Sequence, residues 1–183
     1  MFTDGRSKRL ILVAHCVLNQ NSISDGTAEF PAMNKEAVDL LLQSQVGIIQ
    51  MPCPELHCLG LDRGNLHGAA QPVLVENSRI RRSMKRRSTA RTLSILTRQV
   101  VFQIEEYRKH GFDICGIVGI DRSPSCGVNT TSIGNREVEG EGVFIEMLCK
   151  ELRKRHIRVG MVGIKATSVR NAISSIRRLL YYA

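Results

Sequence analysis

Four short runs of this chain are almost entirely apolar and lack the alternation of a half-exposed strand. Continuous apolar runs of about four to eight residues are typical of strands that are buried on both faces of a parallel sheet. The pattern therefore predicts four buried parallel strands, at residues 10–14, 46–51, 114–120 and 159–164.

The segments between these runs carry apolar residues at helical steps of three and four. One helix is expected to start near Asn34, and the others are expected around residues 93–110, 143–152 and 169–180. Alternation of strand and helix is typical of βαβ units. The sequence therefore predicts an α/β fold, with an open parallel sheet of about four or more strands and helices on both faces. Segments 52–75 and 121–142 show neither a continuous apolar run nor a helical period and are expected to be loops.

Composition is consistent with one globular domain spanning residues 1–183, because 43% of the residues are hydrophobic and 23% are charged. The apolar run near the start is too short for a signal-peptide core, and no stretch approaches the roughly 18 apolar residues of a membrane span. We therefore expect a cytoplasmic protein. In that reducing compartment, six cysteines are better explained as ligands, nucleophiles or core residues than as disulfides.

Three of the cysteines come just after predicted strands: Cys16 after the first, Cys53 after the second and Cys126 after the third. The carboxyl ends of parallel strands meet at one edge of a sheet, where ligands bind. We therefore expect these three thiols to share a metal or catalytic site. Cys115 lies inside a predicted strand and Cys149 inside a predicted helix, so both are expected in the core.

Three thiolates suit a soft metal or an iron–sulfur cluster. Three protein ligands instead of four would leave one iron open, which is typical of a catalytic site. The spacing also permits a zinc site, whose ligands would be Cys53, His57 and Cys58 with either His15 or His67. The residues alone do not choose between iron–sulfur and zinc.

Three separated motifs surround these cysteines. They are Ala14-His15-Cys16-Val17-Leu18-Asn19, Pro52-Cys53-Pro54-Glu55 and Asp121-Arg122-Ser123-Pro124-Ser125-Cys126-Gly127. In these motifs and their order, the chain resembles the TudS-like desulfidase family, including bacterial thiouracil desulfidases, over about residues 8–165. The resemblance implies a Rossmann-like domain with a [4Fe-4S] cluster on Cys16, Cys53 and Cys126. It also implies catalytic roles for Glu55 and Ser123.

The activity that this resemblance implies is a non-redox hydrolysis. The C=S group of a thiolated nucleobase, nucleoside or nucleotide would become C=O, with release of hydrosulfide. Glu55 would take a proton from the attacking water, and Ser123 would orient substrate or water.

The loop after Glu55 departs from the family pattern. The thiouracil branch has a glycine-glycine-leucine-proline stretch that leads to an arginine, whereas this chain has Leu56-His57-Cys58-Leu59-Gly60-Leu61-Asp62-Arg63. The identity of the thiolated substrate therefore stays open. Cys58 is an extra thiol, with possible roles as a spectator, a fourth ligand or a persulfide acceptor.

The net charge of +9 favours anionic partners. Much of the positive charge lies in one stretch without acidic residues: Arg79, Arg81, Arg82, Lys85, Arg86, Arg87 and Arg91. The spacing of Ile80 and Met84 predicts a helix that runs through this stretch into residues 92–110. Its cations form either a solvated helix face or a contact to RNA or phosphate. With no tryptophan and few aromatic residues, stacking on bases is not expected.

Two other functions remain open from the sequence. One is an iron–sulfur protein that transfers or senses sulfur without turnover. The other is a basic RNA-binding module whose cysteines hold structural zinc.

Overall fold

The four apolar runs form one parallel sheet in the computed structural model, which describes residues 2–165 and 167–181. Its strands, in spatial order, are β2 (Gly47–Gln50), β1 (Arg9–Val13), β3 (Asp113–Ile120) and β6 (Met161–Ile164). The chain passes from β1 to β2 on one side and later places β3 on the other side of β1. This change of direction creates a switch point between β1 and β3, the usual position of a ligand site in such sheets.

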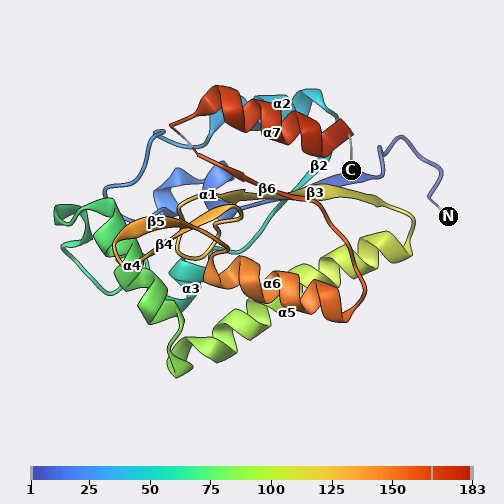
Figure 1. Ribbon diagram of the computed structural model, residues 1–183. Coiled ribbons are helices and arrows are strands. Elements are labelled where there is room, and N and C mark those ends of the chain that lie inside the picture. Colours follow the sequence, from blue (N-terminus) through green and yellow to red (C-terminus); the bar gives the residue numbers. More distant parts are fainter. Residues whose placement is uncertain (1, 166, 182–183) are drawn as a thin grey trace.

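Helices cover both faces of the sheet, so the predicted α/β fold is confirmed (Figure 1). On one face lie α2 (Lys35–Gln43) and α7 (Val169–Tyr181), and on the other lie α5 (Arg87–Lys109) and α6 (Val143–Lys154). Ile11, Leu12 and Val13 of β1 are completely buried. Because both faces of this strand are covered, successive side chains are all apolar, which explains the continuous run in the sequence.

The segment 52–75 contains structure that the sequence analysis missed. Helix α3 (Pro54–Leu59) begins immediately after Cys53, and a short 3-10 turn covers Gly68–Ala70. Proline is favoured in the first turn of a helix because it gives up no hydrogen bond there. Pro54 thus starts a helix of only six residues, too short for an apolar period to be visible. Two further short elements, α1 (His15–Leu18) and the 3-10 turn Gln20–Ser22, follow β1.

The prediction of one helix through the basic stretch is wrong. Helix α4 (Val73–Met84) ends before α5 begins, and the backbone of Arg86 between them is extended, with φ −73° and ψ 155°. The Thr89 hydroxyl donates toward the carbonyls of Met84 and Arg86, at 2.8 Å each, and so holds the corner. Apolar residues face the core on both sides of this corner, so the spacing of apolar residues in the sequence does not reveal it.

The segment 121–142 was expected to be a loop but contains a β-hairpin. Its strands are β4 (Thr130–Ile133) and β5 (Arg136–Glu139). Gly134 and Asn135 join them with φ values of 59° and 62°, which fits a two-residue type I′ turn. β4 is mostly hydroxylated residues, so it lacks the apolar alternation by which a strand is recognised.

Within residues 2–165 and 167–181, no helix combines the length and the apolar character needed to cross a membrane. The longest described helix, α5, is amphipathic and buries Leu93, Leu96, Val100 and Ile104.

Candidate active site

The three strand-end cysteines line one pocket at the carboxyl edge of the sheet. Cys16 lies in α1 directly after β1, Cys53 caps α3 after β2, and Cys126 lies in the loop after β3. Glu55 and Ser123 line the same pocket. The structure thus brings together all five residues that the sequence analysis selected, from three separate segments.

Burial dominates the ionisation of the three thiols. Burial, with a smaller contribution from negative charge at Cys53 and Glu55, raises the pKa of Cys16 to about 12. Burial also raises the pKa of Cys126 well above its usual value, with the Cys16 and Cys53 thiols adding to the effect. Three thiols that oppose one another's ionisation in one pocket need a positive centre to become thiolates together. This donor set fits an iron–sulfur cluster on Cys16, Cys53 and Cys126.

Three neighbours place hydrogen-bond donors within reach of the cysteine sulfurs. The backbone N–H of Leu56 lies 3.4 Å from Cys53 Sγ, and Nη2 of Arg63 lies 3.7 Å from the same sulfur. Ser125 Oγ lies 3.5 Å from Cys126 Sγ. Donors of this kind stabilise a thiolate, and they tune iron–sulfur clusters.

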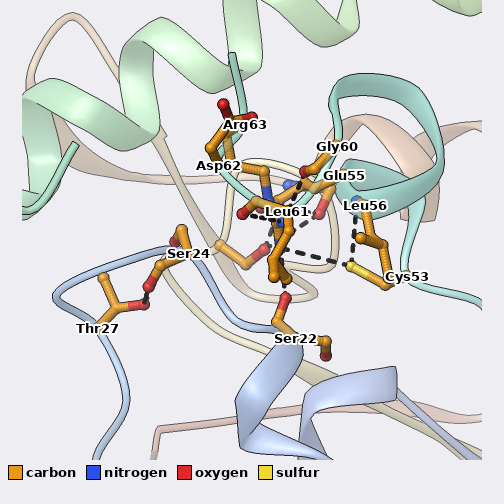
Figure 2. Close-up of polar contacts among 12 residues, drawn as sticks. Ser22, Ser24, Thr27, Cys53, Glu55, Leu56, Gly60, Leu61, Asp62 and Arg63 are labelled. Carbon is orange, nitrogen blue, oxygen red and sulfur yellow. Dashed lines mark hydrogen bonds and ion pairs between the residues drawn. The ribbon is translucent and has the colours of Figure 1, made fainter. Parts of the chain in front are cut away.

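Glu55 is a buried carboxylate, 6% exposed, in the first turn of α3. Its Oε2 accepts a hydrogen bond from Arg63 Nε at 3.1 Å, and its Oε1 accepts one from Ser125 Oγ at 2.5 Å. Both oxygens are therefore held from opposite sides by residues of two different loops. Figure 2 shows Glu55 and Arg63 directed toward each other beside Cys53.

Arg63 is a residue whose role the sequence analysis did not identify. It is 2% exposed, and its guanidinium also donates to the carbonyls of Gly60 and Leu61 at 2.9 Å and of Ser22 at 2.5 Å (Figure 2). It therefore ties the segment after β1 to the loop after α3. A signal was present, because a buried Glu55 needs a cationic partner and Arg63 is the first arginine that follows it.

Ser123 lies in the pocket but, within residues 2–165 and 167–181, forms no hydrogen bond with Glu55. Its Oγ accepts from the backbone N–H groups of Ser125 and Cys126, at 3.2 and 3.0 Å, and so shapes the turn that presents Cys126. The hydroxyl that reaches Glu55 belongs to Ser125, 3.4 Å from Ser123 Oγ. The sequence analysis missed Ser125, although it lies in the same motif two positions further on.

Arg81 fixes the position of the loop that carries these serines. Its Nη1 donates to the carbonyls of Pro124 and Glu141, at 3.3 and 3.0 Å, and to Thr131 Oγ1 at 2.9 Å. The backbone of Gly142 also presses against this loop, because a Cβ at that position would lie 2.4 Å from the Ser125 carbonyl oxygen. The site geometry therefore depends on α4 and on the start of α6.

These contacts correct one part of the expectation for the basic stretch. Arg81 is 8% exposed and is a structural residue, and Arg79 pairs with Glu76 at 2.6 Å and donates to the Arg63 carbonyl at 2.7 Å. The other five cations of the stretch are exposed and do not line the pocket: Arg82, Lys85, Arg86, Arg87 and Arg91. Any phosphate contact of the stretch would be made by these five.

The remaining cysteines lie outside the pocket. Cys115 is completely buried in β3, as expected, whereas Cys149 is only partly buried and lies 3.7 Å from the sulfur of Met161. Cys58 is half-buried on α3, with its sulfur 4.0 Å from the Thr89 carbonyl oxygen.

The zinc set is not assembled in the described residues. No group of three or more histidine, cysteine or acidic side chains is placed there to hold one metal ion. His57 and His67 are exposed and do not line the pocket, although His15 does. A single zinc ion needs every ligand atom about 2.0–2.3 Å from one centre, whereas the cysteines of a cluster bind different irons and stand further apart.

Comparison with known proteins adds one distant relative. No protein-family model and no solved structure matches the chain. The chain is 27% identical over 152 residues to "Uncharacterized protein MJ0003" of Methanocaldococcus jannaschii, a match that covers 83% of both chains. The name of this relative states no activity, so the chemistry must be argued from the site.

Proposed function

We propose that this chain is a [4Fe-4S]-dependent desulfidase that converts the C=S group of a thiolated nucleobase, nucleoside or nucleotide to C=O. Water would supply the oxygen, sulfur would leave as hydrosulfide, and no electrons would be transferred. The observation that carries the proposal is a buried carboxylate, Glu55, in the same pocket as three cysteine thiols. The resemblance of three motifs to the TudS-like family supports it, since each motif contributes to that pocket.

Cys16, Cys53 and Cys126 would hold the cluster. When bound, a cluster with three cysteine ligands supplies a soft Lewis acid that matches sulfur and polarises a C=S bond. The N–H groups of Leu56 and Arg63 would then donate to the Cys53 sulfur. We also propose a cytoplasmic location, because all six cysteines are free thiols and a reducing compartment preserves them.

Glu55 would act as the general base for the attacking water. Each carboxylate oxygen has two lone pairs, and each has accepted one hydrogen bond, from Ser125 or from Arg63. A lone pair on each oxygen therefore remains available to water. The proton that Glu55 takes from water would pass through Ser125 and Ser123, whose hydroxyl oxygens lie 3.4 Å apart, to the departing sulfur, which then leaves as hydrosulfide. In this way Ser123 keeps a catalytic role, exercised through Ser125.

The test is hydrosulfide release by the protein after anaerobic reconstitution with iron and sulfide. Thiouracil, thiouridine and thiouridine 5′-monophosphate are offered in turn, and hydrosulfide and the oxo product are both quantified. We expect equal amounts of the two products from at least one compound. Glu55→Gln should keep its iron and lose the rate by about a hundredfold or more, as expected for a positioned general base.

Two results would contradict the proposal. One is sulfur uptake by the protein without any oxo product, which would indicate a sulfur carrier. The other is a Glu55→Gln protein that turns over as fast as wild type, which would remove the proposed base.

A further inference from the structure

A second pocket lies at the amino edge of the sheet, at the opposite end from the candidate active site. Strand β3 begins at Asp113, but β6 pairs only with its second half, Ile117–Ile120. Residues 111–114 and 157–161 line the open space beside the unpaired first half, which we call the amino-edge groove. This end of the sheet lies away from α1 and α3, the helices that contribute to the candidate active site (Figure 1).

The floor of the amino-edge groove is apolar. Ile114 and Leu152 are buried, and the other apolar lining residues are half-buried, so that they present apolar surface to the groove. These others are Phe112, Ile157, Val159 and Met161. The groove has a volume of about 880 Å³, which lies in the range of about 300–1,000 Å³ that is typical of small-molecule sites. It therefore has room for an apolar chain or ring.

Three exposed arginines surround this apolar floor: Arg108, Arg153 and Arg158. Arg108 Nη1 donates to the Arg158 carbonyl oxygen at 3.2 Å, and within residues 2–165 and 167–181 none of the three guanidinium groups pairs with a carboxylate. The acidic residue that lines the groove is Asp113, whose Oδ2 lies 4.0 Å from Arg9 Nε. The lining of the groove therefore has an excess of positive charge.

The neighbouring Arg155 has a different environment. It does not line the groove, and its guanidinium lies 3.6 Å from a Glu105 carboxylate oxygen and 3.9 Å from one of Glu151. Glu151 also pairs with Lys154 at 2.7 Å. The nearby carboxylates thus pair with cations outside the groove, and the arginines of the groove are left for an anion from solution.

We propose that the amino-edge groove binds a small organic anion with an apolar chain, such as a medium-chain carboxylate. The carboxylate would accept hydrogen bonds from Arg153 or Arg158, because a guanidinium presents paired N–H donors that match its two oxygens. The chain would lie on the apolar floor, where the flexible side chain of Met161 can adapt to its shape. A phosphate of RNA would use the arginines but not the apolar floor. This site is independent of the proposed desulfidase function.

Calorimetric titration of the reconstituted protein tests the proposal. The ligands are octanoate, octan-1-ol, which has the chain without the charge, and acetate, which has the charge without the chain. The proteins are wild type, the double variant Arg153→Gln/Arg158→Gln and the control Arg155→Gln, which removes an exposed cation outside the groove. Melting temperatures check the fold, and the two single variants repeat the test if the double variant is less stable.

We expect octanoate to bind wild type and Arg155→Gln at least about tenfold more tightly than octan-1-ol, the effect of one hydrogen bond to a charged group. Acetate should not bind measurably, and the double variant should bind octanoate no more tightly than octan-1-ol. No binding of octanoate to wild type, or the same affinity in the double variant, would overturn the proposal. Binding of oligouridylate that needs Arg153 and Arg158, without binding of octanoate, would indicate a phosphate contact and would also overturn it.

Discussion

Ser125 contributes more to the geometry around Glu55 than its place in the motif suggests. Its hydroxyl lies 2.5 Å from Glu55 Oε1 and 3.5 Å from Cys126 Sγ, and one O–H can donate to only one of them at a time. The shorter distance favours the carboxylate. Ser123 instead accepts hydrogen bonds from two backbone N–H groups, and in the described residues it forms none with Glu55. The two serines therefore have separable roles.

Ser125→Ala tests this separation. Removing its hydroxyl leaves one Glu55 oxygen without its donor, so we expect kcat to fall by about tenfold or more with iron content unchanged. Ser123→Ala removes the acceptor for two backbone N–H groups next to Cys126, so we expect it to lower iron retention as well as kcat. The measurement is kcat and iron content side by side. Equal kcat values for Ser125→Ala and wild type would show that the hydrogen bond from Ser125 to Glu55 has no role in turnover.

The raised pKa of the Cys16 thiol predicts how stability depends on pH once iron is removed. The folded chain raises the pKa of Cys16 from 9.0 to about 12, so this thiol keeps its proton above pH 9 while the unfolded chain loses it. The stabilisation is therefore complete below pH 9 and decreases as the pH rises above it. Between pH 8 and pH 10, we expect iron-free wild type to lose about 1 kcal/mol more than iron-free Cys16→Ser, measured by urea unfolding. The same pH dependence in both proteins would contradict this.

At the scale of elements, Arg81 joins α4 to the serine loop and to the segment before α6. Its guanidinium satisfies two carbonyls and one hydroxyl in a largely buried position. Its neighbour Arg82 is exposed and has the same charge. The pair offers a matched comparison between a structural and a solvated arginine on one helix.

Arg81→Gln should lower the free energy of unfolding by about 2 kcal/mol, because buried acceptors lose a charged donor. Arg82→Gln should change it by less than about 0.5 kcal/mol, as is usual for an exposed position. Urea denaturation of both variants at one pH measures the difference. Equal stabilities of the two variants would show that the Arg81 contacts do not hold the loop.

The sequence was informative where apolar residues define the element. The strand runs at 10–14 and 114–120 differ from β1 and β3 by one residue, and the helix predicted near Asn34 begins at Lys35. It was uninformative where hydrogen bonds define the element. The polar strand β4, the corner at Arg86 and the short α3 have no apolar period, because a turn, a hydroxyl contact and a proline determine them.

The site residues show the same difference between what apolar patterns reveal and what depends on hydrogen bonds formed after folding. Cys16, Cys53 and Cys126 were identifiable, because strand ends converge at one edge of any parallel sheet. Glu55 and Ser123 came from the resemblance and not from the pattern. Arg63 and Ser125 were missed, since their importance depends on which side chains meet after the loops fold. Sequence spacing does not contain that information.

At the scale of the whole molecule, the net charge of +9 is not concentrated in the pocket. The exposed cations Arg82, Lys85, Arg86 and Arg87 lie at the corner between α4 and α5, outside the pocket lining. We propose that this corner contacts RNA or phosphate. Such a contact is independent of sequence and is weakened by salt.

Replacing these four residues by glutamine should weaken binding of a single-stranded RNA and flatten its salt dependence. Each lost phosphate contact should reduce the slope of log affinity against log salt by about 0.7. Turnover of a thiolated nucleotide should stay unchanged, since none of the four lines the pocket. Filter binding over a salt series measures the slope. An unaltered slope would contradict the proposed contact and would indicate that these cations form only a solvated helix face.

The central claim is that Cys16, Cys53 and Cys126 together hold one [4Fe-4S] cluster. Iron and acid-labile sulfide per chain, measured after strictly anaerobic reconstitution, test it most directly. Wild type and the control Cys115→Ser should each contain about four of both, and serine at any one of the three pocket positions should abolish the cluster. Full iron content in Cys126→Ser, or zinc in place of iron in wild type, would contradict the claim.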